Sequence, residues 1–110
     1  MGYVVNGTER EVDADGYLVE ADFSEEAVKV IAEAEGIELK EDHWKIVQYL
    51  RDQYQEHGQT PNLRNMLKDL AVIMPEHDKN SLYDLFPQGG PAKQGARIAG
   101  LPKPFGKGGY

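Results

Sequence analysis

The start of the chain has the hydrophobic and polar pattern of a β-hairpin. The apolar run Tyr3-Val4-Val5 is followed by Asn6-Gly7, a strong hairpin turn signal because both central residues of such a turn take positive φ. The chain continues from Thr8 to Val12, and a polar turn over residues 13–16 leads into a second apolar run at 17–19. The pattern predicts a hairpin region over about residues 3–19, with residues 17–19 as a candidate third strand.

The next segment has the apolar spacing of a helix near residues 23–35. Asp22 or Ser24 is expected to cap its first turn, and Gly36 is expected to end it in the left-handed conformation. A second helix is predicted from about Glu41 to residue 55 or 56, ended by Gly58. Its inward face is predicted from the residues that recur with helical spacing: Trp44, Val47, Leu50, Arg51 and Tyr54.

A third helix is predicted to begin at Thr60-Pro61 and to end before Pro75. A hydroxyl N-cap followed by proline in the first turn is a common helix start, because the missing proline N–H has no partner there in any case. Two helices joined by a short glycine-containing link form a helix-turn-helix pattern. If the second of these helices contacts DNA, the residues that reach bases and phosphates are Asn62, Arg64, Asn65 and Lys68.

The last third of the chain changes character. A short helix holding Leu82 to Phe86 is expected to start at Asn80 or Ser81, and a final helix is expected from Pro91 to Ala99 with Gly100 as its cap. Residues 101–110 contain prolines and glycines without apolar periodicity, so they are predicted to form a flexible arm. The predicted organisation is one domain over residues 1–100 and an arm over 101–110. The fold class is mainly α with a small β-hairpin, an α+β fold.

Composition and charge limit the classes of function. A chain of 110 residues has room for one core, and no apolar run approaches the length of a membrane span. We therefore expect a cytoplasmic single-domain protein without membrane contact. The net charge of −7 is divided unevenly, with −10 over residues 1–60 and +3 over 61–110. Overall acidity disfavours nonspecific nucleic-acid binding, which depends on phosphate neutralisation, and leaves DNA as a weak partner at most.

Candidate catalytic chemistry is sparse. The chain has no cysteine, which excludes disulfides, thiolate nucleophiles and zinc-thiolate sites. His43, His57 and His77 lie on three segments without a paired metal-ligand spacing, so they are expected to be exposed residues at helix ends, and no metal or cofactor is predicted. No nucleophile motif or phosphate-binding glycine loop is present. The residues themselves give no indication of an enzyme.

Several segments together resemble one known family. They are Asp-Gly-Tyr-Leu at 15–18, Gly-Ile-Glu-Leu at 36–39, His-Trp at 43–44, Leu-Phe-Pro at 85–87, Gly-Pro-Ala-Lys-Gln at 90–94 and Arg-Ile-Ala-Gly-Leu-Pro-Lys-Pro at 97–104. On these motifs the chain resembles the DsrC/TusE family, the gamma-subunit-like proteins of dissimilatory sulfite reductase and their sulfur-relay relatives. The resemblance implies an orthogonal helical bundle with a hairpin, a helix-turn-helix-like pair and a mobile C-terminal arm.

The resemblance also implies sulfur chemistry that this chain lacks. Family members carry a persulfide on a thiol near the end of the arm, and one branch has a second thiol eleven residues earlier. By the family motif these positions fall on Lys107 and Ala96, neither of which holds sulfur. Gly-Gly-Tyr at 108–110 extends beyond the place where the family normally ends, and Lys40 stands where relatives often have a helix-capping threonine.

Three hypotheses follow. The first is a non-catalytic, cysteine-free family member, a monomer that binds a sulfite-reductase αβ assembly or a relay sulfurtransferase and regulates a thiol-bearing paralogue. Its partner-binding residues would be those of the basic C-terminal segment: Lys93, Arg97, Leu101, Pro102, Lys103, Pro104 and Lys107. The second is a transcriptional regulator of sulfur genes that uses the helix-turn-helix. The third is a chain whose thiols were replaced by design.

Overall fold

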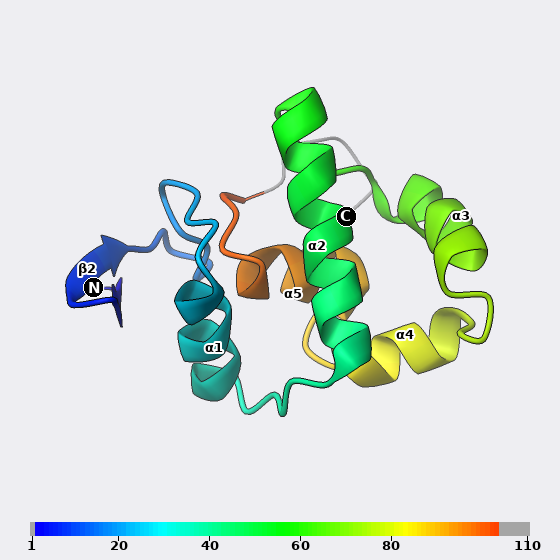
Figure 1. Cartoon of the computed structure of the whole chain (residues 1–110), viewed down its shortest axis with the longest axis horizontal. Helices are drawn as coiled ribbons and strands as arrows, with labels where there is room; N and C mark the ends of the chain where they lie inside the picture. Colours follow the sequence, from blue (N-terminus) through cyan, green and yellow to red (C-terminus); the bar gives the residue numbers. More distant parts are fainter. Residues whose placement is uncertain (1, 104–110) are drawn as a thin grey trace.

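The computed structural model describes residues 2–103 and has a hairpin followed by helices (Figure 1). The elements in chain order are β1 Gly2–Val5, β2 Thr8–Glu11, α1 Glu25–Ala34, α2 Glu41–His57, α3 Leu63–Ile73, α4 Lys79–Leu85 and α5 Gly90–Ile98. Within the described range the only sheet is the two-stranded one, so the predicted α+β class is confirmed. None of the helices described is long and apolar enough to cross a bilayer.

The hairpin forms where the turn signal placed it. β1 pairs antiparallel with β2 in a register that sets Val5 opposite Thr8, and the turn residues Asn6 and Gly7 have φ of 51° and 81°. Residues 17–19 do not form the third strand, since a single bridge between Val12 and Leu18 is all that pairs there. Leu18 is instead 1% exposed within the helical core, so its burial outweighs strand pairing.

The predicted caps of α1 are confirmed. Ser24 is the N-cap, and its hydroxyl oxygen accepts a hydrogen bond from the N–H of Ala27 at 3.2 Å. Asp22 has a different role, because its carboxylate accepts from the N–H of Ser24 at 2.9 Å and so fixes the approach to the helix. Gly36 follows the helix with a φ of 74°.

The second helix also matches its prediction, whereas the start of the third does not. Gly58 ends α2 with a φ of 77°. The N-cap of α3 is Asn62 rather than Thr60, and its side chain accepts from the N–H of Asn65 at 2.9 Å. Thr60 is 3% exposed within the link, and a residue before proline is biased toward extended backbone, so the helix starts after Pro61.

The fourth helix starts earlier than Asn80 or Ser81, the two predicted N-caps. Asp78 is the N-cap, its carboxylate accepting from the N–H of Ser81 at 2.8 Å while the Ser81 hydroxyl oxygen accepts from the N–H of Asp78 at 2.9 Å. This reciprocal pair satisfies two N–H groups that the helix itself leaves without partners. Ser81 therefore belongs to the cap as its third helical residue.

The last helix is the centre of the bundle. α5 contacts α1, α2, α3 and α4, and Figure 1 shows it lying between α1 and α4 behind α2. Gly95 makes this close packing possible, because a Cβ at that position would lie 3.0 Å from Cδ1 of Leu50 on α2. Glycine is unfavourable in a helix interior on backbone entropy alone, and here the close helix packing explains it.

Candidate functional site

The family resemblance places one of its two thiol positions in α5, and the C-terminal end of this helix is deeply buried. Ala96, at the earlier of the family's thiol positions, is 0% exposed, and its carbonyl oxygen accepts from the N–H of Leu101 at 3.1 Å. Leu101 is also 0% exposed. Leu101 was predicted to be the first residue of the arm and a partner-binding residue. It is instead part of the core, because removing its isobutyl side chain from water lowers the free energy of the folded protein.

A buried arginine holds the segment that follows α5. Arg51 of α2 is 7% exposed and donates hydrogen bonds to the carbonyl oxygens of Ala99 at 2.8 Å, Asp22 at 3.0 Å and Ser24 at 2.9 Å. Burial lowers the pKa of its guanidinium from the ordinary value, although the negative charge of Asp22 works in the opposite direction. The helical spacing predicted an inward-facing Arg51, but no sequence pattern indicates that its partners are backbone carbonyls.

Gly100 completes this junction. Its φ is 77°, and a Cβ there would lie 2.5 Å from the carbonyl oxygen of Asp22. The N–H of Asp22 in turn donates to the carbonyl oxygen of Gly100 at 2.8 Å. The base of the C-terminal segment is therefore fixed against residues 22–24, and only glycine is compatible with the close approach.

Arg97 has most of its donors committed inside the protein. Its guanidinium donates to both carboxylate oxygens of Glu35, at 2.8 and 2.9 Å, and to the carbonyl oxygen of Gln88 at 3.0 Å. It also lies over the ring of Tyr17, 5.6 Å from the ring centroid. The hydrogen bonds to Glu35 raise the pKa of Arg97 from its ordinary value. Arg97 was predicted to bind a partner, and the structure uses it to join α5 to the end of α1.

Gln94, of the Gly-Pro-Ala-Lys-Gln motif, extends the same network. It is 0% exposed, donates to the Glu35 carboxylate at 2.8 Å and accepts from the N–H of Gln88 at 2.8 Å. Both ends of the side-chain amide are thus satisfied, as a buried polar group requires. This glutamine was not singled out in the sequence as a site residue, and here it positions the start of α5.

Three of the remaining predicted docking residues, Lys93, Pro102 and Lys103, lie in the described part of the chain and are called the basic edge below. Lys93 and Lys103 are exposed and Pro102 is half-buried, while Pro104 and Lys107 lie outside the described residues. The ammonium of Lys103 forms an ion pair with the carboxylate of Asp15 and lowers the pKa of that carboxyl. Because both partners are well exposed to solvent, this ion pair contributes little to stability.

The candidate DNA-contacting residues on α3 are only partly available. Arg64, Asn65 and Lys68 are exposed, but the side chain of Asn62 serves as the N-cap of the helix. Tyr49 of α2 donates a hydrogen bond to Asp69 of α3, so a carboxylate also lies on this helix. The exposed face therefore offers two cations, a small electrostatic basis for binding phosphates.

The expectation that the three histidines are exposed holds only for His57. His43 is 4% exposed, and its Nδ1 accepts from the N–H of Lys40 at 3.1 Å while its Nε2 donates to the carbonyl oxygen of Leu85 at 2.9 Å. The side chain of His77 is 14% exposed. Both rings were misjudged because their hydrogen-bond partners come from other helices or from adjoining caps, which helix position alone does not show.

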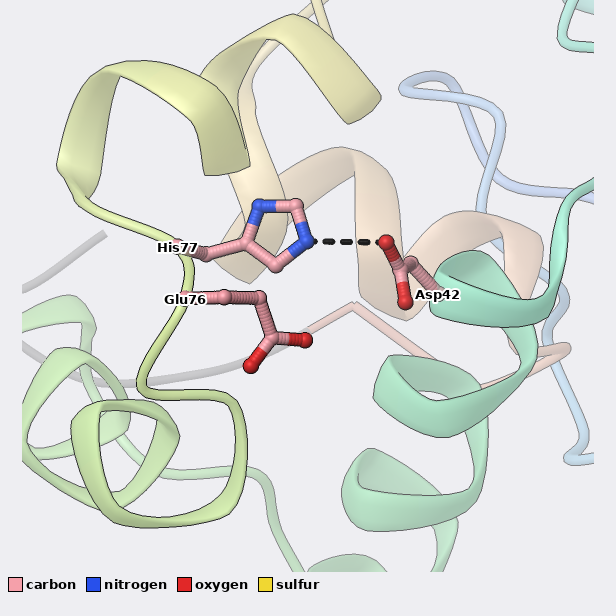
Figure 2. Close-up of side chains that lie close together, drawn as sticks. All are labelled: Asp42, Glu76 and His77. Carbon is pink, nitrogen blue, oxygen red and sulfur yellow. Dashed lines mark hydrogen bonds and ion pairs between the residues drawn. The ribbon is translucent and has the colours of Figure 1, made fainter.

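His77 lies in a cluster that the sequence spacing did not reveal. Figure 2 shows its imidazole turned toward Asp42 at the start of α2, with Glu76 beside it. The Nε2 of His77 is 2.8 Å from Oδ2 of Asp42, and one ligand atom from each of the three residues lies within 4.8 Å of the others. A search for ligands at helical spacing misses this group, because Asp42 lies in α2 whereas Glu76 and His77 lie in the link between α3 and α4.

The fold and the α5 junction can now be compared with known proteins. The family model described as "DsrC like protein" matches residues 4–106 of this chain. The chain belongs to the DsrC/TusE family. The resemblance seen in the sequence motifs is thereby confirmed over nearly the whole chain, and the match ends one residue before Lys107.

Individual relatives and solved structures that resemble this DsrC/TusE protein support the family assignment. It is 47% identical over 104 residues to sulfurtransferase TusE of Escherichia coli K12, covering 92% of this chain and 94% of that one. It is 44% identical over 103 residues to a TusE homolog of Haemophilus influenzae, covering 91% and 94%. The oxidized DsrC gamma-subunit of Archaeoglobus fulgidus superposes with a TM-score of 0.83 at 39% identity, covering 94% and 97%.

A structure in solution gives the same result. DsrC of Allochromatium vinosum has a TM-score of 0.82 to this chain at 39% identity, covering 93% of each. Relatives named as sulfur-transfer proteins and as sulfite-reductase subunits thus share this fold. The chain is therefore a sulfur-relay family protein in its architecture, and it contains no cysteine.

Proposed function

We propose that this protein docks the partners of its family's sulfur chemistry without carrying sulfur itself. In this role it occupies the surface that a thiol-bearing paralogue uses, and it regulates that paralogue by competition. The relatives are named as a sulfurtransferase and as sulfite-reductase subunits. The corresponding partners for this chain are a relay sulfurtransferase or a sulfite-reductase αβ assembly.

One observation carries the proposal: the junction around α5 is fully built although sulfur is absent. Arg51, Gln94 and Arg97 keep their internal hydrogen bonds, and Gly100 keeps its left-handed backbone, while the buried position 96 holds a methyl group. A lysine ammonium in place of the arm thiol cannot form an S–S bond. Retaining the scaffold without the nucleophile supports a binding role over a transfer role.

The exposed basic edge is the proposed contact surface. Lys93 and Lys103 supply the positive charge of this edge, the Lys103 ammonium being shared with Asp15, and Pro102 precedes Lys103 in the chain. Pro104 and Lys107 continue the same sequence. A partner with an acidic cleft would be attracted at long range, and such attraction acts mainly on the association rate. Proline in the segment reduces the conformational entropy lost on docking.

The test is a calorimetric titration of the intact protein against each purified partner. A chain ending at Lys103 is the informative truncation, because it removes the last seven residues and keeps the buried Leu101. Binding that weakens at least about tenfold on truncation, and that also weakens as salt rises from about 50 to 500 mM, supports docking through this edge. Equal affinity of the two chains would show that residues 104–110 do not contribute to docking.

Charge-reversal variants at single positions distinguish binding through the basic edge from a response to the net charge of the protein. Lys93→Glu is expected to slow association, whereas Lys29→Glu makes the same change in net charge at an exposed position on α1. If the two variants lose affinity equally, the partner responds to net charge alone and the proposed surface is wrong. If neither partner binds the intact chain at micromolar concentrations, the proposed function is wrong.

A further inference from the structure

We propose that Asp42, Glu76 and His77 form a binding site for one divalent transition-metal ion of the zinc class. The three residues come from the first turn of α2 and from the link between α3 and α4 (Figure 2). They offer one imidazole nitrogen and two carboxylate oxygens, all within 4.8 Å of one another. One nitrogen and two oxygens from protein, with water in the remaining position, is a donor set that zinc accepts.

The hydrogen bonds of Ser81 orient the ring of His77. The Ser81 hydroxyl lies 3.1 Å from the carbonyl oxygen of Asp78, to which it can donate. Its oxygen also lies 2.9 Å from Nδ1 of His77, and it accepts there when its own proton is shared with Asp78. In that arrangement Nδ1 carries the hydrogen, and Nε2 is the nitrogen available to a metal ion.

The other ring nitrogen already faces a second candidate ligand. Nε2 of His77 lies 2.8 Å from Oδ2 of Asp42, where it either donates to the carboxylate or, with its proton displaced, shares a metal ion with it. A histidine ligand whose other ring nitrogen donates to a fixed oxygen is the usual arrangement in metal sites, because the hydrogen bond orients the ring.

The second carboxylate, that of Glu76, favours a metal ion over a proton on His77. Within residues 2–103, Glu76 forms no hydrogen bond or ion pair, yet it lies beside an already paired carboxylate. A proton on His77 balances one negative charge, whereas a divalent ion balances both.

The geometry needs only small adjustments to close around an ion. Bonds of about 2 Å to zinc place tetrahedral ligand atoms about 3.3 Å apart. The Asp42 and His77 atoms would therefore separate slightly from 2.8 Å, and the exposed Glu76 side chain would move inward from its present spacing. The bound ion would tie the start of α2 to the α3–α4 link and would raise stability, since it binds only the folded arrangement.

The test is a calorimetric titration of the untagged full chain with zinc chloride, followed by imidazole NMR signals. We expect saturation at one ion per chain in the micromolar range, with the signals of His77 shifting. His77→Ala should weaken binding by at least about tenfold. Because that variant also loses two hydrogen bonds, Glu76→Gln is the second variant, and it should weaken binding severalfold without changing the unfolding temperature of the metal-free protein.

The matched control is His57→Ala. His57 is an exposed histidine 3.9 Å from Glu56, outside the cluster, so its removal should leave the zinc affinity unchanged. Three results would overturn the site: no saturable binding below about 1 mM, unchanged affinity in His77→Ala, or shifts centred on His57. In the first case the contact between His77 and Asp42 is a structural hydrogen bond only.

Discussion

Glu35 and Arg97 are joined by two hydrogen bonds of 2.8 and 2.9 Å although 62 positions separate them in the sequence. The side chains are 12% and 16% exposed, so the pair is largely removed from water. Glu35 also accepts from Gln94. One carboxylate at the end of α1 therefore fixes two residues of the central helix α5.

Replacing Glu35 with alanine should destabilise the protein by about 2–3 kcal/mol, because a largely buried guanidinium and a buried amide then lose their acceptor. Urea unfolding followed by circular dichroism measures the change. Glu33→Ala on the same helix is the control, and its exposed side chain should give a change within about 0.5 kcal/mol. Similar losses in the two variants would mean that the Glu35–Arg97 pair adds nothing.

Leu101→Ala should cost about 2–4 kcal/mol, since the side chain is 0% exposed and its removal leaves a cavity at the base of the C-terminal segment. Val72→Ala, at a side chain that is 80% exposed, should have almost no effect. Thermal unfolding of both variants tests this prediction. If the Leu101→Ala variant is as stable as the unmodified protein, Leu101 does not belong to the core and the predicted arm begins at this residue.

The native chain should accept no sulfur from a persulfide donor, because it has no thiolate. Intact-mass measurement checks for a gain of about 32 Da per sulfur atom. Lys93→Cys, at an exposed position, should gain the adduct and so shows that the donor is active. Ala96→Cys should stay unmodified in the folded protein, because that position is fully buried. An adduct on the native chain would contradict the proposed docking role.

The stability contributed by Asp22 should depend on pH. Burial alone would raise the pKa of this carboxyl, but hydrogen bonds from Ser24 and the charge of Arg10 outweigh it, so the pKa lies below the ordinary value of 3.8. The contribution is present above the unfolded pKa and is lost as the pH falls through the lower folded pKa. The stability gap between native protein and Asp22→Asn should therefore be widest near neutral pH and should shrink toward about pH 2. An equal gap at both pH values would exclude this linkage.

Duplex DNA should bind no more tightly than tens of micromolar at physiological salt, because Arg64 and Lys68 are the exposed cations of the α3 face. Fluorescence anisotropy with DNA from upstream of the gene measures the affinity. Submicromolar binding that disappears when both residues are changed to alanine would favour the regulator hypothesis instead.

Local sequence signals predicted most helix boundaries and failed at the starts of α3 and α4. Gly36 and Gly58 end their helices because glycine adopts positive φ without steric cost. Thr60-Pro61 was predicted to start the third helix, but Thr60 is buried in the link and Asn62 is the N-cap. The Asp78 cap was missed for a related reason, since Ser81 serves the cap from within the helix.

By itself, the sequence determined the hairpin turn, the helical periodicity, the family motifs and the absence of any thiol, because each is a property of residue type or of neighbours along the chain. Only the tertiary structure decided that Leu101 is core, that Arg51 binds backbone carbonyls and that Asp42 meets His77. These are contacts between residues far apart in the chain. They exist because helices pack to bury apolar surface, and that packing brings together polar groups whose spacing along the sequence has no period.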